Sequence, residues 1–415
     1  MMRLFIMMGF LLVIDLYSFQ ALRILGQTWG APARTAAYAL FWSIPLLVLA
    51  YFFAYNYLDG EGWNRNTHTY LRTFIFIAYM SKMLVLPFLA IDDVRRAVQW
   101  TLERVGARTN FSSSRSRFLT QFGVLIGSIP FFSLTYGMIR NAYRYKLFYT
   151  PLEFDDLPDA LHGLKIVQIS DIHSGSFTFK EPVKTAIDLI NAQKPDLVFF
   201  TGDLVNERAD EMLPFLDIFD KIESRHGVYS IVGNHDYGDY VEWPTPEAKI
   251  ANFESLKDMH RRLGWDLLLN ENRVLDIRDT RLAVIGVENY SAHLRFPRHG
   301  DLKKASIGTE TADFKVLLSH DPSHWDVQVN KDHPDIRLML SGHTHGMQFG
   351  VEIPGWLKWS PIKYLYKQWA GLYQKDQQYL YVNRGLGFLG YPGRVGILPE
   401  IACLELRKKG ATPLG

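Results

Sequence analysis

The stretch Gly202-Asp203-Leu204-Val205-Asn206 closely follows the apolar run Leu197-Val198-Phe199-Phe200. Four more stretches have this form, in which a run of four or five mostly apolar residues precedes Asp, Asn or His. They are Asp171-Ile172-His173, Gly233-Asn234-His235-Asp236, Ser319-His320-Asp321 and Gly342-His343-Thr344-His345. Such runs predict buried strands that end in loops. Because strands of one sheet present their carboxyl ends at a common edge, we expect the polar residues to converge there.

The side chains in these stretches are typical of metal ligands. They are carboxylates, a carboxamide and imidazoles, without a thiolate, and this set suits divalent ions such as Mn, Fe, Zn or Ni. An Asp-X-His or His-X-His pair on a loop that leaves a strand can direct both side chains at one ion. A single such motif is as often an ordinary surface or core feature, but five in order favour a metal site.

The five stretches together resemble the calcineurin-like metallophosphoesterase family. Its motifs run D-x-H, G-D-x-x-[DN], G-N-H-[DE], H and G-H-x-H, and residues 150–406 contain every one in this order. The resemblance implies an α/β fold, a four-layer α/β/β/α sandwich, with two divalent ions. One ion would take Asp171, His173, Asp203 and His345, and the other would take Asp203, Asn234, His320 and His343.

The resemblance also implies a hydrolytic reaction. Two ions ~3.5–4 Å apart activate a water that attacks a phosphomonoester or phosphodiester. His235 would face the leaving group, as general acid or as donor to a phosphate oxygen, and Asp236 would orient its ring. The alternative is a purely structural pair of His235 and Asp236. Asn206 is expected to brace the ligands.

A late stretch, Tyr381-Val382-Asn383-Arg384-Gly385-Leu386-Gly387, resembles a loop of bacterial relatives. Asn383 and Arg384 are therefore candidates for substrate binding, and Arg384 could hold phosphate with two parallel hydrogen bonds. A structural salt bridge of Arg384 with an acid is equally compatible with the sequence. Histidines outside the five motifs are interpreted as surface residues: His293, His299, His324 and His333.

The first part of the chain is strongly apolar. It holds four stretches of about the ~20 residues that cross a bilayer as a helix, at 4–25, 36–58, 70–91 and 118–139. We therefore predict an all-α, multi-pass transmembrane domain at 1–146, a catalytic domain at 147–408 and a tail at 409–415. Asp15 and Lys82 lie inside spans and are expected to face the bundle interior, as an ion pair or as a functional relay.

The Lys and Arg residues of the short loops predict the orientation in the membrane. One side carries eight: Arg23, Arg34, Arg95, Arg96, Arg104, Arg108, Arg115 and Arg117. The other side carries six: Arg3, Arg65, Arg72, Arg140, Arg144 and Lys146. The excess predicts a cytoplasmic loop at 92–117, in the inner or plasma membrane, and an extracytoplasmic catalytic domain.

Composition limits the partners. The net charge is +2, so no strong field recruits nucleic acid, and the single cysteine, Cys403, excludes an intramolecular disulfide. Aromatic residues and lysines alternate over 356–369, a composition typical of an element at a membrane surface. We therefore expect a membrane-bound phosphoester hydrolase acting on a lipid-linked substrate. The alternatives are the same hydrolase acting on a soluble nucleotide or phosphodiester, and a catalytically silent membrane scaffold.

Overall fold

The computed structural model describes residues 2–58, 65–106, 112–353 and 355–410. It consists of two compact units, Met1–Ile139 and Arg140–Gly415. Residues 140–146 were expected in the transmembrane domain and belong to the second unit. Residues 107–111 of the predicted basic loop and 411–415 of the predicted tail lie outside the described residues.

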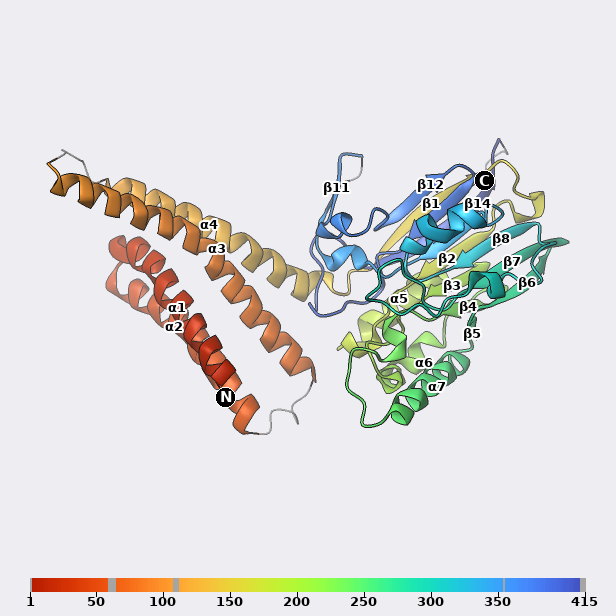
Figure 1. Ribbon diagram of the computed structural model, residues 1–415, viewed down its shortest axis with the longest axis horizontal. Coiled ribbons are helices and arrows are strands. Elements are labelled where there is room, and N and C mark those ends of the chain that lie inside the picture. The colour runs from red at the N-terminus through yellow and green to blue at the C-terminus, as the bar shows by residue number, and fades with distance from the viewer. Residues whose placement is uncertain (1, 59–64, 107–111, 354, 411–415) are drawn as a thin grey trace. The chain divides into compact units, whose positions relative to one another are not determined.

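The first unit contains the predicted transmembrane helices (Figure 1). Its described helices long and apolar enough to cross a membrane are α1 (Met2–Leu25), α2 (Ala31–Tyr57), α3 (Arg65–Arg104) and α4 (Ser113–Tyr136). Pro45, Pro87 and Pro130 lie inside them, which membrane helices tolerate. Helix α3 is much longer than the predicted span 70–91 and takes up the first part of the predicted basic loop.

Polar contacts hold the first added turn of α3 against α4. Arg95 bonds to the buried Asp92 carboxylate three residues earlier, and both contact Ser116 at the start of α4. Arg117 donates to Thr28 after α1, with 2.6 Å between Nη2 and Oγ1. The residues after α1 and the start of α4 therefore lie at the same end of the first unit.

The two charges inside the spans contact one another. Lys82 Nζ lies 2.5 Å from Asp15 Oδ1, and the Tyr79 hydroxyl donates to Asp15 Oδ2 at 2.7 Å. The pair is buried between α1 and α3. Because pairing offsets the cost of placing charge at membrane depth, a structural ion pair accounts for both residues.

The second unit is built on two mixed six-stranded sheets (Figure 1). The first has the order β1-β14-β2-β3-β4-β5: Lys146–Phe154, Glu400–Lys408, Lys165–Ile169, Leu197–Thr201, Val228–Ile231 and Asp266–Leu267. The second has the order β12-β13-β9-β8-β7-β6: Gly371–Lys375, Gln378–Val382, Leu338–Ser341, Phe314–Leu318, Thr280–Gly286 and Glu271–Ile277. The predicted hairpin at 273–287 is β6–β7, which pair antiparallel.

Three apolar cores define four layers. The inner faces of the two sheets pack together through residues such as Phe199, Val316 and Leu404. Helices α5 (Lys180–Ala192), α6 (Leu216–Phe219) and α7 (Pro246–Arg262) cover the outer face of the first sheet. The short α8 (Leu302–Ala305) and the turn Trp325–Val329 cover the second. The predicted α/β/β/α sandwich is confirmed.

A two-stranded hairpin stands apart from both sheets. It consists of β10 (Val351–Ile353) and β11 (Leu357–Trp359) and projects beyond the sandwich (Figure 1). It begins shortly after His345 and lies within the stretch that links the last metal motif to β12.

Candidate metal centre

The predicted ligands follow the carboxyl ends of five strands, drawn from both sheets. Asp171 and Asp203 come two residues after β2 and β3, and Asn234 comes three residues after β4. His320 and His343 each come two residues after β8 and β9. Because neighbours β2, β3 and β4 run parallel, as do β8 and β9, each sheet presents its ligands at one edge.

The backbone at the ligands is unusual. Five of them have positive φ, between 46° and 72°: Asp171, His173, Asp203, His343 and His345. Non-glycine residues adopt this left-handed conformation at an energetic cost, and such residues cluster at functional sites. The strain turns successive side chains of one loop, such as Asp171 and His173, toward a common point.

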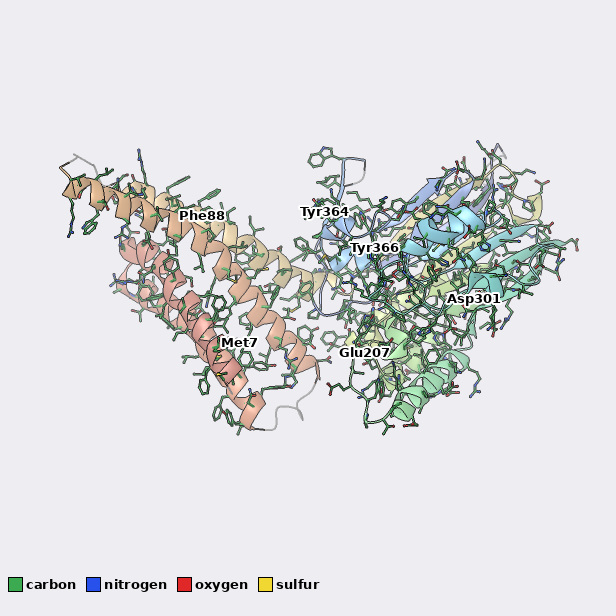
Figure 2. The ribbon with its side chains drawn as sticks, viewed as in Figure 1. Met7, Phe88, Glu207, Asp301, Tyr364 and Tyr366 are labelled. Carbon is green, nitrogen blue, oxygen red and sulfur yellow. The ribbon has the colours of Figure 1, made fainter. Side chains whose placement is uncertain are left out.

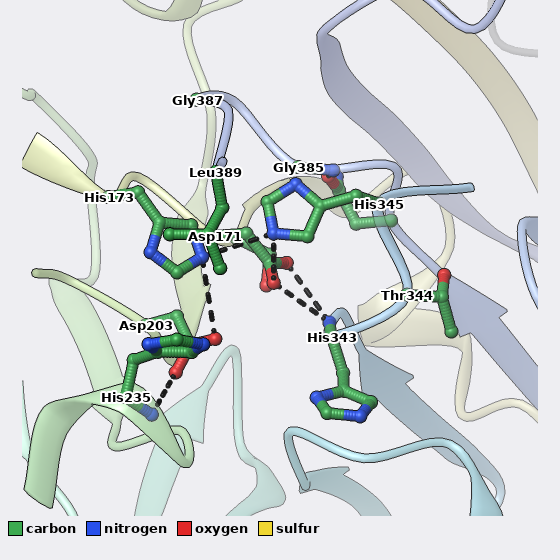
Figure 3. A network of polar contacts seen from close by, with 12 residues as sticks. Asp171, His173, Asp203, His235, His343, Thr344, His345, Gly385, Gly387 and Leu389 are labelled. Atoms are coloured by element: carbon green, nitrogen blue, oxygen red, sulfur yellow. Dashed lines mark hydrogen bonds and ion pairs between the residues drawn. The ribbon is translucent and has the colours of Figure 1, made fainter. Parts of the chain in front are cut away.

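Two groups of ligand atoms result, and Figure 3 shows the first group together with Asp203 and His343 of the second. In the first, His345 Nε2 lies 3.2 Å from Asp171 Oδ1 and 3.1 Å from His173 Nε2. In the second, Asp203, His320 and His343 bring one ligand atom each within 4.8 Å of one another. Asp203 Oδ2 connects the groups, since it lies 3.5 Å from His173 Nε2 and 3.1 Å from His320 Nε2.

Buried polar atoms show that this donor set fits cations. Among the described residues Asn234 Oδ1 is buried without a hydrogen-bond partner, and the buried His320 Nε2 lies against the Asp203 carboxylate, at 3.1 Å. His320 Nδ1 donates to the Thr201 carbonyl at 2.7 Å, which leaves Nε2 as the nitrogen that faces Asp203 and the second ligand group. Buried groups without partners are costly, and a divalent ion would satisfy them. The described residues therefore suit the predicted divalent metals.

A hydrogen bond from outside the ligand groups determines which imidazole nitrogen of His343 carries the lone pair. The Tyr366 hydroxyl donates to Asp321 Oδ2 at 3.1 Å, so it accepts from His343 Nε2 at 2.9 Å. The lone pair of His343 is thus on Nδ1. Such outer contacts orient imidazole ligands at metal sites, and Tyr366 is a supporting residue that the motifs did not identify.

Two glycines allow the loops to approach the carboxylates closely. A Cβ on Gly233 would lie 2.2 Å from Asp203 Oδ1, and one on Gly342 would lie 2.2 Å from Asp171 Oδ2. Any larger side chain would displace the carboxylate. These positions explain why the motifs begin with Gly before Asn234 and His343.

The imidazoles of the pocket do not share one charge state. Burial would lower the pKa of His320, but the neighbouring Asp203 carboxylate raises it to about 10. Burial alone would raise the pKa of Asp203, but the charges of His320 and His235 hold that pKa well below its usual value. Burial lowers the pKa of His173 to about 3 and that of His343 to about 4. Metal ligands must be deprotonated, and these three side chains are already in the binding form.

His235 borders the pocket without joining either group of ligand atoms. Its Nδ1 lies 2.8 Å from the Asn206 carbonyl and 3.5 Å from Glu207 Oε1, and its ring packs on Tyr240. Burial would lower the pKa of His235, but the Asp203 charge and the Glu207 hydrogen bond raise it to about 9. Asn206 thus braces His235 through its backbone oxygen.

The expected orienting role of Asp236 is wrong. Its carboxylate faces the backbone, where it accepts from the N–H groups of Asp203, Leu204 and Gly233 at 2.8–2.9 Å. These bonds hold the loops that carry Asp203 and Asn234. The carbonyl of Asn206 takes the partner position on His235 because the 3₁₀ turn at His235–Tyr237 directs Asp236 inward.

Arg384 and Asn383, the expected substrate-binding residues, are bonded within the protein interior instead. Arg384 is buried and bonds to Glu400 Oε2 and Glu352 Oε1, both at 2.6 Å. Asn383 donates to the Gln168 carbonyl and accepts from the Gly385 N–H. Neither residue lines the metal pocket. The salt-bridge alternative for Arg384 is therefore the correct one.

Two arginines near the candidate site are not identified by the sequence motifs. Arg394 is fully buried and donates to the carbonyls of Arg384, Gly385 and Gly387, with Nη2 3.4 Å from His345 Nδ1. Arg295 lines the cavity above the ligands, about 420 Å³ in volume, and stacks on Phe296. Neither residue lies in a motif, so sequence order offers no signal for them.

Two family models and several known proteins are similar to this chain. Residues 2–142 match a family model described as a probable calcineurin-like phosphoesterase transmembrane domain, and residues 164–347 match the calcineurin-like phosphoesterase model. The metallophosphoesterase YkuE of Bacillus subtilis is 30% identical over 71% of this chain and 98% of that protein. A Helicobacter pylori metallophosphoesterase is 26% identical over 97% of this chain and 99% of its own length. The match to a zebrafish (Danio rerio) transmembrane protein with a metallophosphoesterase domain, 30% identical, covers 66% of this chain and 60% of that relative.

Proposed function

The chain belongs to the calcineurin-like metallophosphoesterase family, and we propose that it is a membrane-bound hydrolase of phosphoesters with a binuclear metal centre. The observation that carries the proposal is the position of Asp203. Its Oδ2 lies within 3.5 Å of His173 in one ligand group and 3.1 Å of His320 in the other. One carboxylate so placed can bridge two cations.

Seven side chains would hold the two ions. Asp171, His173 and His345 serve one ion and Asn234, His320 and His343 the other, with Asp203 shared. When bound, two divalent ions polarise phosphoryl oxygens and make a water nucleophilic near neutral pH. The loops held by Asp236 and Arg394 keep the ligand spacing fixed.

His235 has the position of a proton donor. Its Nδ1 is occupied by the Asn206 carbonyl, which leaves Nε2 to face the cavity. Burial opposes protonation of the ring, whereas the Asp203 charge and the Glu207 hydrogen bond favour it. A cationic imidazole at the cavity wall can protonate a departing alkoxide or donate to a phosphate oxygen.

Arg295 is the cation that we assign to the substrate. Within the described residues its guanidinium makes no ion pair, and the side chain is exposed at the cavity wall. Guanidinium groups bind phosphate oxygens with two parallel hydrogen bonds. Arg295 thus takes the role that the sequence suggested for Arg384.

The substrate that fits best is an amphiphilic phosphoester. Apolar side chains of Phe296, Ile362 and Leu389 stand beside the polar ligands in the cavity wall, and the chain carries a transmembrane domain. A soluble nucleotide or diester would use the same ligands without these apolar contacts. We place the catalytic unit on the extracytoplasmic side of the inner or plasma membrane, from the excess of Arg at the α1–α2 and α3–α4 end.

The test is metal-dependent hydrolysis by the full-length chain in detergent. We expect chelation to abolish cleavage of a chromogenic phosphodiester, and reloading with Mn, Fe, Zn or Ni to restore it. Hydrolysis that survives complete metal removal would contradict the proposal. A protein that binds metal but cleaves neither monoesters nor diesters would favour the scaffold.

A further inference from the structure

The β10–β11 hairpin has its apolar face outward. In the antiparallel register Val351 pairs with Trp359 and Ile353 with Leu357. Because alternate residues of a strand share a face, these four side chains lie together, and Glu352 and Lys358 lie on the opposite face. Val351, Ile353 and Leu357 are 40%, 42% and 40% exposed.

The polar face is fixed to the catalytic unit. Glu352 bonds to Arg384 at 2.6 Å, and Lys358 Nζ donates to the Ala370 carbonyl above the Trp369 ring. The hairpin therefore cannot turn over to bury its apolar side without breaking the partly buried ion pair of Glu352 and Arg384. A hairpin with one apolar and one polar face usually packs the apolar face on the core. In β10–β11 the polar face contacts the catalytic unit, and the apolar face is exposed.

More apolar surface surrounds the hairpin. Trp356 between the strands is 79% exposed, and Tyr364 and Leu365 in the turn that follows are 74% and 58% exposed. Figure 2 shows Tyr364 at the surface beside the hairpin and Tyr366 closer to the sheets. Trp369, which the composition placed in the same surface, is instead buried in a small core with Ile362 and Tyr366.

The apolar surface reaches the mouth of the metal pocket. Ile362 and Tyr366, in and just after the turn, line the cavity, while Tyr364 and Leu365 between them are exposed. Met347, two residues after His345, is also exposed. A molecule seated on this surface would thus lie next to the ligands.

We propose that this apolar surface, formed by Val351, Ile353, Trp356, Leu357, Tyr364 and Leu365, inserts into an anionic phospholipid bilayer. Large exposed apolar patches mark interaction sites. The transmembrane domain keeps a bilayer permanently available to the same chain. Between Gly346 and Trp369 the only acidic residue is Glu352, which is paired, whereas Lys363 and Lys367 are exposed. Lysines beside apolar side chains favour anionic head groups.

The contact can be measured without reference to catalysis. A nitroxide is attached at Trp356→Cys in a full-length chain that also carries Cys403→Ser, reconstituted into vesicles of phosphatidylethanolamine and phosphatidylglycerol. We expect collisions with oxygen, which concentrates in lipid, to exceed those with water-soluble chromium oxalate. The same label at Ile353→Cys provides a second position on the face. The control is Ile250→Cys on α7, 63% exposed.

The oxygen-to-oxalate ratio at both hairpin positions should be several-fold higher than at Ile250→Cys. Equal ratios at all three positions would overturn the proposal, because the hairpin would then face water. Low accessibility to both reagents, with spin–spin broadening between labels, would overturn it in favour of a second copy of the chain. Hydrolysis of a soluble phosphodiester by the same variants reports separately on the proposed reaction, since no ligand is changed.

Discussion

At the scale of single residues, His235 differs from the other histidines of the site because its ring is not one of the candidate metal ligands. It bonds to the Asn206 carbonyl and packs on Tyr240, but it belongs to neither group of ligand atoms. We expect His235→Ala to keep its metal content and to lose ~100- to 10,000-fold in kcat on substrates with poor leaving groups. The loss should be much smaller for nitrophenyl esters, whose leaving group is stable without a proton. Equal losses on both kinds of substrate would contradict the general-acid role and leave donation to a phosphate oxygen.

Arg295 gives a second test at this scale. Removing a charge-assisted hydrogen bond to phosphate costs ~1.5–3 kcal/mol, so Arg295→Ala should lower kcat/KM by about 10- to 100-fold, mainly through KM. Metal content should not change. Arg295→Lys should recover part of the loss, and Arg261→Ala on the surface of α7 should have no effect. An unchanged KM in Arg295→Ala would remove this residue from the site.

Sequence order predicted which candidate ligands lie together, but not their supporting contacts. The seven proposed ligands lie in short motifs, where local order places Asp, Asn and His shortly after strands. The roles of Asp236, Arg384 and Arg394 depend on partners that are distant in sequence, such as Asp203, Glu352 and His345. His324, expected at the surface, is fully buried between Ser319 and Gln328 for the same reason.

At the scale of elements, the first residue of β14 connects the two sheets. Glu400 is fully buried and accepts from the Arg384 side chain, the Arg384 N–H and the Tyr381 hydroxyl. Removing one partner of a buried ion pair costs about 3–5 kcal/mol. We therefore expect Glu400→Ala to lower the free energy of unfolding by that amount in a denaturant titration.

The same strand offers a control. Glu405 pairs with Arg407 at 2.8 Å, near the surface, where an ion pair contributes less than ~1 kcal/mol. Glu405→Ala should therefore unfold almost like the wild type. Equal stability of Glu400→Ala and Glu405→Ala would mean that the buried network contributes no net stability.

Periodicity predicted most elements, with two informative failures. Long apolar or alternating runs identified the spans, the central strands and the β6–β7 hairpin. The extension of α3 to Arg104 could not be predicted from hydropathy, because its outer part is polar and is held by Asp92, Arg95 and Ser116. The ligands were expected at one sheet edge, whereas the second sheet supplies His320 and His343.

At the scale of the whole molecule, the chain combines a transmembrane domain with a metallophosphoesterase domain. The orientation predicts which surface residues a membrane-impermeant maleimide reaches in sealed cells. In a Cys403→Ser chain we expect labelling at Ile250→Cys in the catalytic unit and none at Val105→Cys after α3 until the cells are lysed. Both residues are exposed, at 63% and 74%. The reverse pattern would place the catalytic unit in the cytoplasm.

The central claim is that Asp203 bridges two ions, and metal analysis of purified full-length protein tests it most directly. Wild-type protein should bind two divalent ions per chain and hydrolyse a chromogenic phosphodiester. Asp203→Asn keeps the shape of the side chain but removes the shared negative charge, so both ions and the activity should be lost together. Asp217→Asn, a change at an exposed carboxylate on α6, serves as the matched control. An Asp203→Asn protein that retains two ions and near-normal turnover would contradict the account.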